Sequence, residues 1–414
     1  MTQAQLLGQR AKQAEKTLAT ASTELKNKAL ENMAQELISA TSEILSANAE
    51  DMKNARANGV AQVMLDRLLL TEDRIVGMAK GITDIVRLPD PIGVTLSEIK
   101  RPNGMTVKKI TVPLGVIAVI YEARPNVTSD AAALCLKSGN AVILRGGKEA
   151  INSSKAIVKA LRLGLGKTGL DENCISLITD TSRDSATELM RMNEYIDVLI
   201  PRGGAGLIRS CVENSTVPVI ETGTGNCHIY IDKDADIQMA ADIVYNAKTS
   251  RPSVCNSAES LVIHKDIIKE ALPIIKKRLD EKNVELRGDD TARTSADGIL
   301  PATEDDWGRE YLDYIMSVKT VESLDEAIEH ISKYSTGHSE CIVTENEAVA
   351  EEFLKRIDSA AVYHNVSTRF TDGGEFGFGA EIGISTQKLH ARGPLGLPQL
   401  TSFKYIICGN GQIR

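Results

Sequence analysis

Between residues 112 and 225, short apolar runs alternate with segments of helical composition. The apolar runs lie at residues 115–120, 141–144, 175–178, 198–200 and 217–220. Helical segments such as 153–165 and 185–191 separate them. A strand that is apolar along its whole length needs cover on both faces, which is typical of a parallel sheet with crossover helices. The alternation therefore predicts an α/β fold, in which ligands bind at the carboxyl ends of the strands.

The flanking segments have other patterns. Residues 1 to about 90 are rich in Ala, Leu, Glu, Lys and Gln, with apolar residues three and four positions apart, and so predict helices. Residues 94–100 and 105–112 alternate polar and apolar side chains around Asn103-Gly104, which predicts a β-hairpin. The strand-like tail at 400–408 is a candidate to pair with this arm.

The bulk composition narrows the class of protein. With 414 residues, the chain is long enough for two or more domains. Its net charge of −8 argues against a nucleic-acid partner. No apolar run reaches the ~18 residues that span a bilayer, and the N-terminus has no apolar signal core. We therefore expect a cytoplasmic protein without a membrane partner.

The cysteines and histidines form no ligand or disulfide pattern. The seven cysteines are scattered without a Cys-x-x-Cys pair, and the six histidines have no metal-ligand spacing. We expect no metal site, no disulfide framework, and mostly reduced thiols in a packed interior.

Cys255 has different surroundings from a packed thiol. Its neighbours are small and polar, and it lies between a helix predicted at 239–248 and a strand predicted at 261–263. A thiol on such a loop is held in place and stays reachable, as a nucleophile requires. The alternative is one more reduced thiol in the core.

Three polar segments follow predicted strands, and each has two interpretations. Arg145-Gly-Gly-Lys148 suits an anionic ligand or is a solvated basic turn. The glycines of Pro201-Arg-Gly-Gly-Ala-Gly206 either approach a phosphate or form a tight turn. Glu221, which begins Glu-Thr-Gly-Thr-Gly, is a candidate base or a cap of the turn.

The order of these segments resembles the aldehyde dehydrogenase superfamily, from about residue 20 onward. Ser138-Gly-Asn140, Asp325-Glu-Ala-Ile328 and Phe376-Gly-Phe-Gly-Ala380 complete the series. Three further stretches resemble one branch of that superfamily, the enzymes that reduce L-glutamyl 5-phosphate in proline biosynthesis. These stretches are Val366-Ser-Thr-Arg-Phe370, Gly379-Ala-Glu-Ile-Gly-Ile-Ser-Thr386 and His390-Ala-Arg-Gly-Pro-Leu-Gly396.

The resemblance implies a fold of three parts. They are a Rossmann-like NADP-binding domain at 1–93 and 113–225, an α/β catalytic domain at 226–385, and an oligomerisation hairpin with a C-terminal tail at 94–112 and 386–414. The hairpin of this superfamily pairs with the catalytic sheet of a neighbouring subunit. We therefore expect a homo-oligomer, and also a functional association with glutamate 5-kinase.

The resemblance also implies a covalent mechanism. Cys255 matches the family nucleophile, whose thiolate would attack the acyl phosphate, expel phosphate and leave a thioacyl group that accepts hydride to give L-glutamate 5-semialdehyde. Donors must face the oxyanion at each step: the backbone N–H of Cys255 is one, and Asn126 and Arg124 both lie near the position of a family asparagine. Glu221 matches the glutamate that activates water in hydrolytic relatives, so it is a candidate for proton transfer or for holding its loop.

Cofactor contacts follow from the same resemblance. Arg145 stands where the family carries a lysine at the adenosine ribose, and Lys148 where NAD-preferring members often carry a glutamate. A lysine there attracts a 2′-phosphate, so we expect NADP(H). Gly203, Gly204 and Gly206 would lie against the pyrophosphate, and Glu310 matches a glutamate at the nicotinamide ribose.

The substrate carries a phosphate at one end and a carboxylate at the other, and arginine suits both. Arg124, Arg369 and Arg392 are the candidates. Two other functions stay open at this point. One is an NAD-dependent hydrolytic aldehyde dehydrogenase, and the other is a catalytically silent binding or assembly protein of the same fold.

Overall fold

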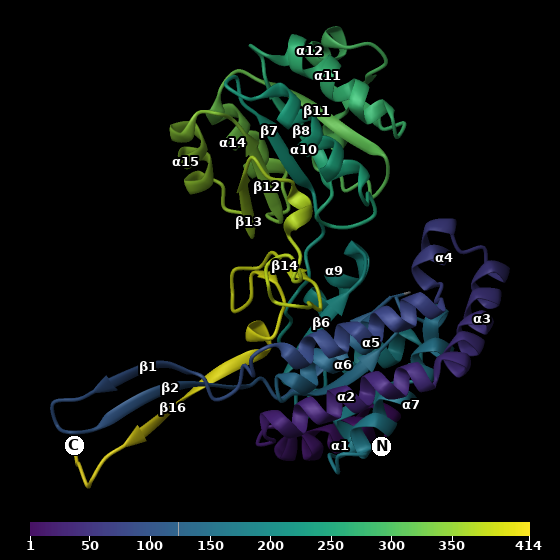
Figure 1. Ribbon diagram of the computed structural model, residues 1–414, viewed down its shortest axis with the longest axis vertical. Coiled ribbons are helices and arrows are strands. Elements are labelled where there is room, and N and C mark those ends of the chain that lie inside the picture. The colour runs from purple at the N-terminus through teal and green to yellow at the C-terminus, as the bar shows by residue number, and fades with distance from the viewer. Residues whose placement is uncertain (123) are drawn as a thin grey trace. The chain divides into compact units, whose positions relative to one another are not determined.

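The computed structural model describes residues 1–122 and 124–414 (Figure 1). The contacts between Cα atoms cluster into two compact units of this part of the chain. The first contains Met1–Thr222, Gly377–Gly383 and Leu395–Arg414, and the second contains Gly223–Phe376 and Ile384–Pro394. The three-part domain division stays a prediction; in the contact division, the first unit takes in the hairpin and the end of the tail.

The first unit begins with a run of helices, as the composition of residues 1–90 predicts. They are α1 (Gln3–Leu18), α2 (Thr23–Ser39), α3 (Thr41–Ala57), α4 (Gln62–Leu68) and α5 (Glu72–Arg87). Thr2, Ser22 and Thr71 cap α1, α2 and α5, because each side-chain oxygen accepts a backbone N–H of the first turn. Helix α2 packs against both α5 and α7 (Ile151–Gly166), and Figure 1 shows these helices side by side.

The first unit also contains a parallel sheet, with strand order β5-β4-β3-β6. Its strands are β3 (Val116–Tyr121), β4 (Ala141–Arg145), β5 (Ile175–Leu177) and β6 (Val198–Arg202). The crossover helices are α6 (Asn126–Lys137), α7 (Ile151–Gly166), α8 (Arg183–Leu189) and α9 (Ala205–Asn214). Every residue of β3 is buried. The α/β fold expected from continuous apolar strands is confirmed.

One predicted strand is wrong. Residues 217–220 form only an isolated bridge, between Leu199 and Val219. Leu199 donates to the carbonyl of Pro218 and accepts from the N–H of Ile220. Pro218 has no N–H of its own to donate, so the ladder does not extend through it.

The predicted hairpin and its tail form a three-stranded antiparallel arm. Strand β1 (Thr95–Lys100) pairs with β2 (Thr106–Pro113), and β16 (Thr401–Cys408) pairs with the other edge of β2. The turn at residues 101–105 includes Gly104, whose φ of 90° favours glycine. Both the hairpin and the pairing of the tail with it are confirmed. Figure 1 shows the three strands running side by side.

The second unit is built on a parallel sheet with strand order β10-β9-β11-β8-β7-β12-β13. The strands are β7 (Cys227–Ile231), β8 (Ala258–His264), β9 (Glu285–Gly288), β10 (Leu300–Pro301), β11 (Ile315–Val321), β12 (Ser339–Val343) and β13 (Ala361–His364). The helices are α10 (Ile237–Thr249), α11 (Ile268–Asp280), α12 (Asp290–Ser295), α13 (Glu304–Trp307), α14 (Leu324–Tyr334) and α15 (Glu347–Arg356). Two short strands, β14 (Ile384–Ser385) and β15 (Gly393–Pro394), pair apart from this sheet.

Helices cover both faces of this second sheet. Along β7, Ile229 and Ile231 pack in one apolar cluster with residues of α10 and α11. Tyr230, which points to the other face, packs with residues of α14 and α15. Apolar side chains therefore cover both faces of β7, as the alternation of side chains along a strand between two helical layers requires.

Across residues 1–122 and 124–414, none of the helices has both the length and the apolar character to cross a bilayer.

Candidate active site

Cys255 lies on the segment between α10 and β8, which we call the cysteine loop (residues 250–257). Helix α10 ends at Thr249, and Pro252 prevents its continuation because proline cannot donate the next helical hydrogen bond. Cys255 is half-buried, while five of the other cysteines are buried and Cys408 is exposed. The predicted placement of Cys255 on a loop between helix and strand is confirmed.

The buried thiols are unsuited to nucleophilic attack. Burial raises the pKa of Cys174 and Cys341 to about 12 and that of Cys211 to about 11. Burial also raises the pKa of Cys135 and of Cys227, the latter well above its usual value. Because the thiolate is the reactive form, these five stay protonated and inert at neutral pH.

The backbone of Gly225 lies directly against the backbone of Cys255. A Cβ on Gly225 would lie 1.5 Å from the Cys255 carbonyl oxygen and 2.8 Å from its Cα. The Cys227 thiol, at the start of β7, donates to the same carbonyl oxygen at 3.2 Å. Cys227, the first residue of β7, and Gly225, two positions before it, therefore both contact the Cys255 backbone from beneath the cysteine loop.

A second segment, residues 367–371, holds the loop from the other side. The amide nitrogen of buried Asn256 donates to the carbonyls of Arg369 and Thr371, at 3.2 and 2.9 Å. The Arg369 guanidinium donates in return to Asn256 Oδ1 and, at 3.0 Å, to Ser250 Oγ. Thr368 Oγ1 donates to the Asn256 carbonyl at 2.8 Å. The residue after the nucleophile is therefore held by several hydrogen bonds.

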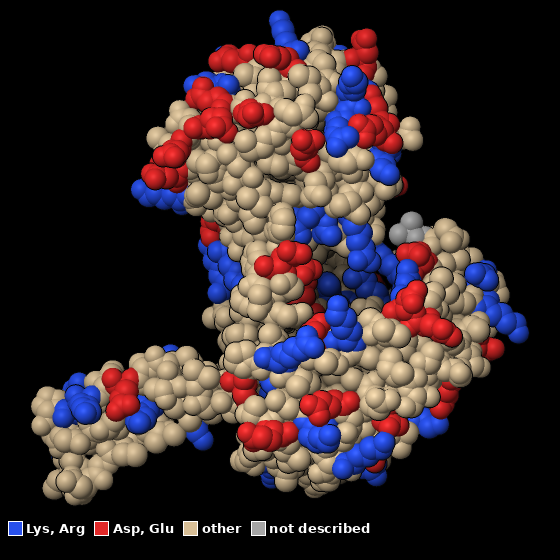
Figure 2. Space-filling view, viewed as in Figure 1, with Lys and Arg blue, Asp and Glu red and all other residues tan. Residues whose placement is uncertain are grey.

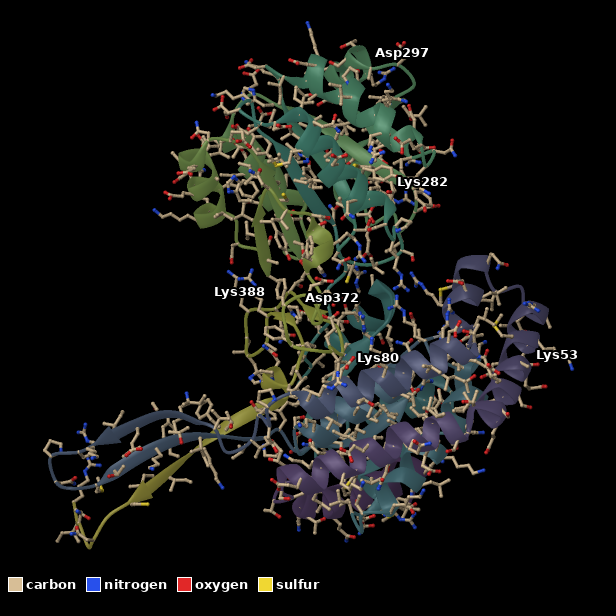
Figure 3. The ribbon with its side chains drawn as sticks, viewed as in Figure 1. Lys53, Lys80, Lys282, Asp297, Asp372 and Lys388 are labelled. Carbon is tan, nitrogen blue, oxygen red and sulfur yellow. The ribbon has the colours of Figure 1, made fainter. Side chains whose placement is uncertain are left out.

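Arg369 also lies within electrostatic range of the nucleophile. Burial lowers the pKa of Arg369, and the neighbouring charge of Arg251 lowers it further. The charges of Asp372 and Cys255 act in the opposite direction on that pKa. Figure 3 labels Asp372, which follows the 367–371 segment. A guanidinium beside the thiol suits an anionic substrate, and the role of Arg369 in binding it stays a prediction.

Glu310 contacts the backbone beside the nucleophile. Its Oε1 accepts from the N–H of Gly225 at 2.7 Å. This contact lies within the second unit, between the segment after α13 and the segment before β7. The ribose contact expected of Glu310 stays a prediction, while the structure gives its carboxylate a positioning contact that the sequence did not suggest.

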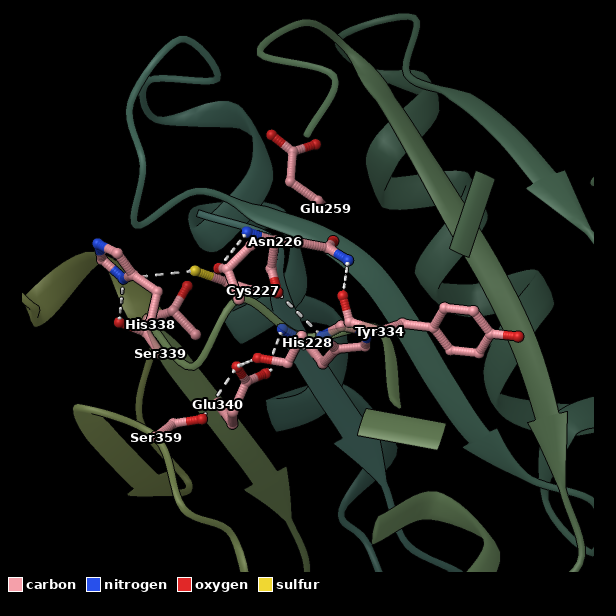
Figure 4. A network of polar contacts seen from close by, with 12 residues as sticks. Asn226, Cys227, His228, Glu259, Tyr334, His338, Ser339, Glu340 and Ser359 are labelled. Atoms are coloured by element: carbon pink, nitrogen blue, oxygen red, sulfur yellow. Dashed lines mark hydrogen bonds and ion pairs between the residues drawn. The ribbon is translucent and has the colours of Figure 1, made fainter. Parts of the chain in front are cut away.

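A polar network beneath the cysteine loop was missed by sequence reasoning. Figure 4 shows Cys227, His338 and Ser339 close together. His338 Nδ1 lies 3.7 Å from Cys227 Sγ and 2.7 Å from Ser339 Oγ. Ser339 Oγ in turn lies 2.6 Å from Thr371 Oγ1. These residues come from three places in the sequence, and the pairing of β7 with β12 brings Cys227 close to His338 and Ser339.

In the first unit, Arg145 and Lys148 differ in their surroundings. Arg145 Nη2 donates to the carbonyls of Thr181 and Ser182, each at 2.8 Å. Its buried Nε has no hydrogen-bond partner within residues 1–122 and 124–414, and burial lowers its pKa. Lys148 is exposed. An incompletely bonded guanidinium and an exposed ammonium, three residues apart in the sequence, suit a phosphorylated ligand.

Gly203, Gly204 and Gly206 lie exposed at the start of α9. The N–H of Gly204 donates to Glu122 Oε2 at 2.9 Å. A Cβ on Gly203 would lie 2.6 Å from the same oxygen. An anionic oxygen therefore already occupies this helix N-terminus, and a phosphate oxygen would suit the same donor. Glu122 was not among the predicted residues.

The remaining predicted residues have partners of their own. Asn126, at the start of α6, is exposed and donates to Asp130 Oδ2 at 3.0 Å. Desolvation raises the pKa of half-buried Asp130 to about 6. Arg124 and Glu221 are half-buried in the first unit. The catalytic and substrate roles given to these residues stay predictions.

Arg392 is bound to a carboxylate rather than left open. Its guanidinium donates to Asp358 Oδ1 and to the Asp358 carbonyl, each at 2.7 Å. Lys388, labelled in Figure 3, also pairs with Asp358. These two cations lower the pKa of Asp358 to about 2, so the carboxylate competes with a substrate anion for Arg392. The predicted substrate contact of Arg392 is untested.

Comparisons with known proteins define the class. A family model described as the aldehyde dehydrogenase family matches residues 2–296, so the chain belongs to that family. Gamma-glutamyl phosphate reductase of Clostridium beijerinckii is 60% identical over 414 residues, the whole of both chains. The crystal structure of gamma-glutamyl phosphate reductase from Thermotoga maritima, 48% identical, covers 100% of both chains with a TM-score of 0.97. Within the family the chain falls among the gamma-glutamyl phosphate reductases, and the branch predicted from the motifs is confirmed.

A more distant likeness supports the fold alone. An acetylating aldehyde dehydrogenase from Geobacillus thermoglucosidasius is 18% identical, with a TM-score of 0.72 over 100% of this chain and 97% of its own. The predicted aldehyde dehydrogenase-like fold class is thus confirmed. Membership of the family implies a nicotinamide cofactor and a small-molecule substrate.

Proposed function

We propose that the chain reduces L-glutamyl 5-phosphate to L-glutamate 5-semialdehyde with NADPH and releases phosphate, as a step of proline biosynthesis. The observation that carries the proposal is the half-buried Cys255 on a loop that the Arg369 guanidinium holds through Ser250 and Asn256, in a chain 60% identical to a gamma-glutamyl phosphate reductase over its full length. A reachable thiol next to a fixed cation suits attack on an anionic acyl phosphate.

The first chemical step is acyl transfer. The Cys255 thiolate attacks the acyl carbonyl carbon, so a C–S bond forms while the C–O bond to phosphate breaks. Phosphate leaves with the electron pair and takes up a proton, for which Glu221 is the candidate donor. The oxyanion of the tetrahedral intermediate needs aimed donors, and the Cys255 N–H and the Asn126 amide are the candidates.

The second step regenerates the thiol group. The cofactor, when bound, supplies a hydride. The thioester on Cys255 accepts it at the carbonyl carbon, and collapse of the resulting alkoxide breaks the C–S bond. The aldehyde leaves and the Cys255 thiolate returns to its starting form. Arg369, Arg124 and Arg392 are the candidates to hold the substrate's phosphate and carboxylate during both steps.

The first unit's residues fit a phosphorylated dinucleotide. The Gly204 N–H, which Glu122 now occupies, would face the pyrophosphate. Exposed Lys148 and the partly bonded Arg145 would attract the 2′-phosphate that distinguishes NADP from NAD. These residues favour NADP(H) over NAD(H), and Glu310 remains the candidate at the nicotinamide ribose.

As part of the proposal, the chain forms a homo-oligomer whose subunits contact one another through the arm. Leu96, Ile99, Phe403, Tyr405 and Ile407 are each about half exposed on the arm. Figure 2 shows that most of the visible surface of the arm is uncharged. Apolar side chains exposed on the two outer strands of the arm favour cover by a second copy of the chain. A functional association with glutamate 5-kinase is part of the same proposal.

The test is reduction of NADP⁺ with glutamate 5-semialdehyde, with and without inorganic phosphate. We expect activity that requires phosphate and is lost in Cys255→Ala. A rate independent of phosphate would favour the NAD-dependent hydrolytic alternative. Full activity of Cys255→Ala would end the covalent mechanism, and no activity of the folded parent would favour the silent binding or assembly protein.

A further inference from the structure

A lysine and a glutamate form an ion pair at the two ends of the cysteine loop. Lys248 lies in the last turn of α10, and Glu259 is the second residue of β8. The distance from Lys248 Nζ to Glu259 Oε2 is 2.6 Å, and both side chains are 0% exposed. Ser257 Oγ adds a parallel tie by donating to the Ala247 carbonyl at 3.1 Å. The loop that carries Cys255 is therefore closed at its base by two polar contacts.

The stability of the fold does not by itself explain this pair. Burial lowers the pKa of Lys248 and raises that of Glu259 to about 7, while their mutual attraction opposes both changes. Asp313 and Cys227 also act on Lys248, and Glu310 acts on Glu259. A buried ion pair is often no more stabilising than apolar residues of the same volume. A specific geometric requirement is the better explanation for two buried charges at this place.

Glu259 also links the pair to the floor of the loop. Its second oxygen, Oε1, accepts from the N–H of Leu312 at 3.2 Å. Leu312 has a φ of 56°, a left-handed conformation that a branched side chain adopts only under constraint. Two residues before it, Glu310 accepts from the Gly225 N–H, and Gly225 lies against the backbone of Cys255.

We propose that Lys248 and Glu259 are positioning residues for Cys255. Their ion pair sets the base of the cysteine loop directly, and it sets the Gly225 backbone through Leu312 and Glu310. Figure 4 shows Glu259 on the strand that follows the loop, near the Cys227 network. The inference rests on the proposed function only in taking Cys255 as the nucleophile.

The test measures the reactivity of Cys255 apart from any substrate. Lys248→Met and Glu259→Gln are made in a Cys408→Ser background, since Cys408 is the exposed thiol. Iodoacetamide alkylation is timed and located by peptide mass mapping. We expect alkylation at Cys255 to slow about tenfold, because the rate depends on the exposure of the thiol and on the charges around it, both of which the loop sets. In the reductase assay kcat falls with it, while KM stays within about twofold because neither residue contacts the substrate.

Two controls separate positioning from folding. Lys26→Met breaks a comparable pair in the first unit, where Lys26 and Asp90 lie 2.7 Å apart with 2% and 14% of their side chains exposed. It should lower Tm and leave alkylation at Cys255 unchanged. The double variant Lys248→Met/Glu259→Gln buries no charge, so it should regain Tm while alkylation stays slow.

The outcomes decide the proposal. Parent-like alkylation in both single variants would overturn it. If the alkylation rate of Cys255 recovers together with Tm in the double variant, the ion pair serves only the stability of the fold, and the proposal is overturned as well. If Lys248→Met does not fold, the alkylation rate of the double variant is compared with that of the parent instead. Failure of the proposed reaction is seen separately, because alkylation requires neither substrate nor cofactor.

Discussion

Of the glycines described above, Gly225 is the one whose replacement by alanine should displace Cys255 the most. The added Cβ would lie 1.5 Å from the Cys255 carbonyl oxygen, whereas real Cβ contacts essentially never fall below 3.0 Å. The atom that it meets is backbone, so no flexible side chain can give way. Either the cysteine loop or the start of β7 must shift by about 1.5 Å.

A shift of that size predicts a large loss of rate. Misplacement of a reacting group by about 1 Å costs about 100-fold, which corresponds to ~2.7 kcal/mol in the activation barrier. We expect kcat to fall at least that far, while the parent's circular dichroism spectrum is retained. Iodoacetamide labelling of Cys255 should slow as well, because the Cys227 thiol and the Gly225 backbone contact the same carbonyl.

Two glycines of the first unit provide matched controls. Gly164→Ala also meets backbone, with its Cβ 2.6 Å from Met33 Cα, so it should lower Tm without changing the alkylation of Cys255. Gly77→Ala meets nothing within 4 Å and should leave both quantities unchanged. If Gly225→Ala keeps kcat within about threefold of the parent while Gly164→Ala behaves as expected, the close-approach argument is refuted.

Three other predictions test the substrate and cofactor residues. Lys148→Glu should shift the preference from NADPH toward NADH, and an unchanged ratio of kcat/KM for the two cofactors would contradict the 2′-phosphate contact. Arg369→Ala should raise KM by about 10- to 100-fold if a charged hydrogen bond to substrate is lost. It should also lower kcat because Asn256 Oδ1 loses its guanidinium donor, and an unchanged KM would remove Arg369 from the substrate site. Asp130 is held by Asn126 and Ser129 and faces the charge of Arg202, and desolvation raises its pKa to about 6. A carboxyl group with a raised pKa stabilises the fold at pH values below the unfolded pKa of about 4, and that stabilisation is lost as the pH rises through about 6. The dependence of Tm on pH between these values should therefore be flatter in Asp130→Asn than in the parent. Equal Tm values for the two proteins at every pH would contradict the raised pKa of Asp130.

Much of the fold was predictable because hydrophobic pattern determines it. Continuous apolar strands between helices predicted the first sheet, and alternation around Asn103-Gly104 predicted the arm. The prediction failed at residues 217–220, where the apolar pattern is present but Pro218 removes a donor from the ladder. A hydrophobic pattern predicts which side chains are buried, but it does not predict whether the backbone can form the hydrogen bonds of a sheet.

The site was only partly predictable for a related reason. Cys255 was found because its own neighbours are small and polar. Lys248 and Glu259 look in the sequence like an ordinary charged helix end and a strand residue, and they meet only after α10 packs on β8. His338 and Glu122 were missed in the same way, since their partners are Cys227 and Gly204, far away in the chain. A contact between segments that are far apart in the sequence produces no recognisable pattern in either segment.

The antiparallel pairing of β2 with β16 has a consequence for how the protein is made. Thr106 pairs with Cys408, so about 300 residues must be synthesised between the two partners. At the ~5–20 residues per second of translation, β2 waits tens of seconds for its second neighbour. During that time one edge of the arm offers unpaired N–H and C=O groups to any passing strand. A nascent chain of this kind should therefore depend on chaperones while β2 lacks its second neighbour, and assembly through the arm should begin only after β16 has been made.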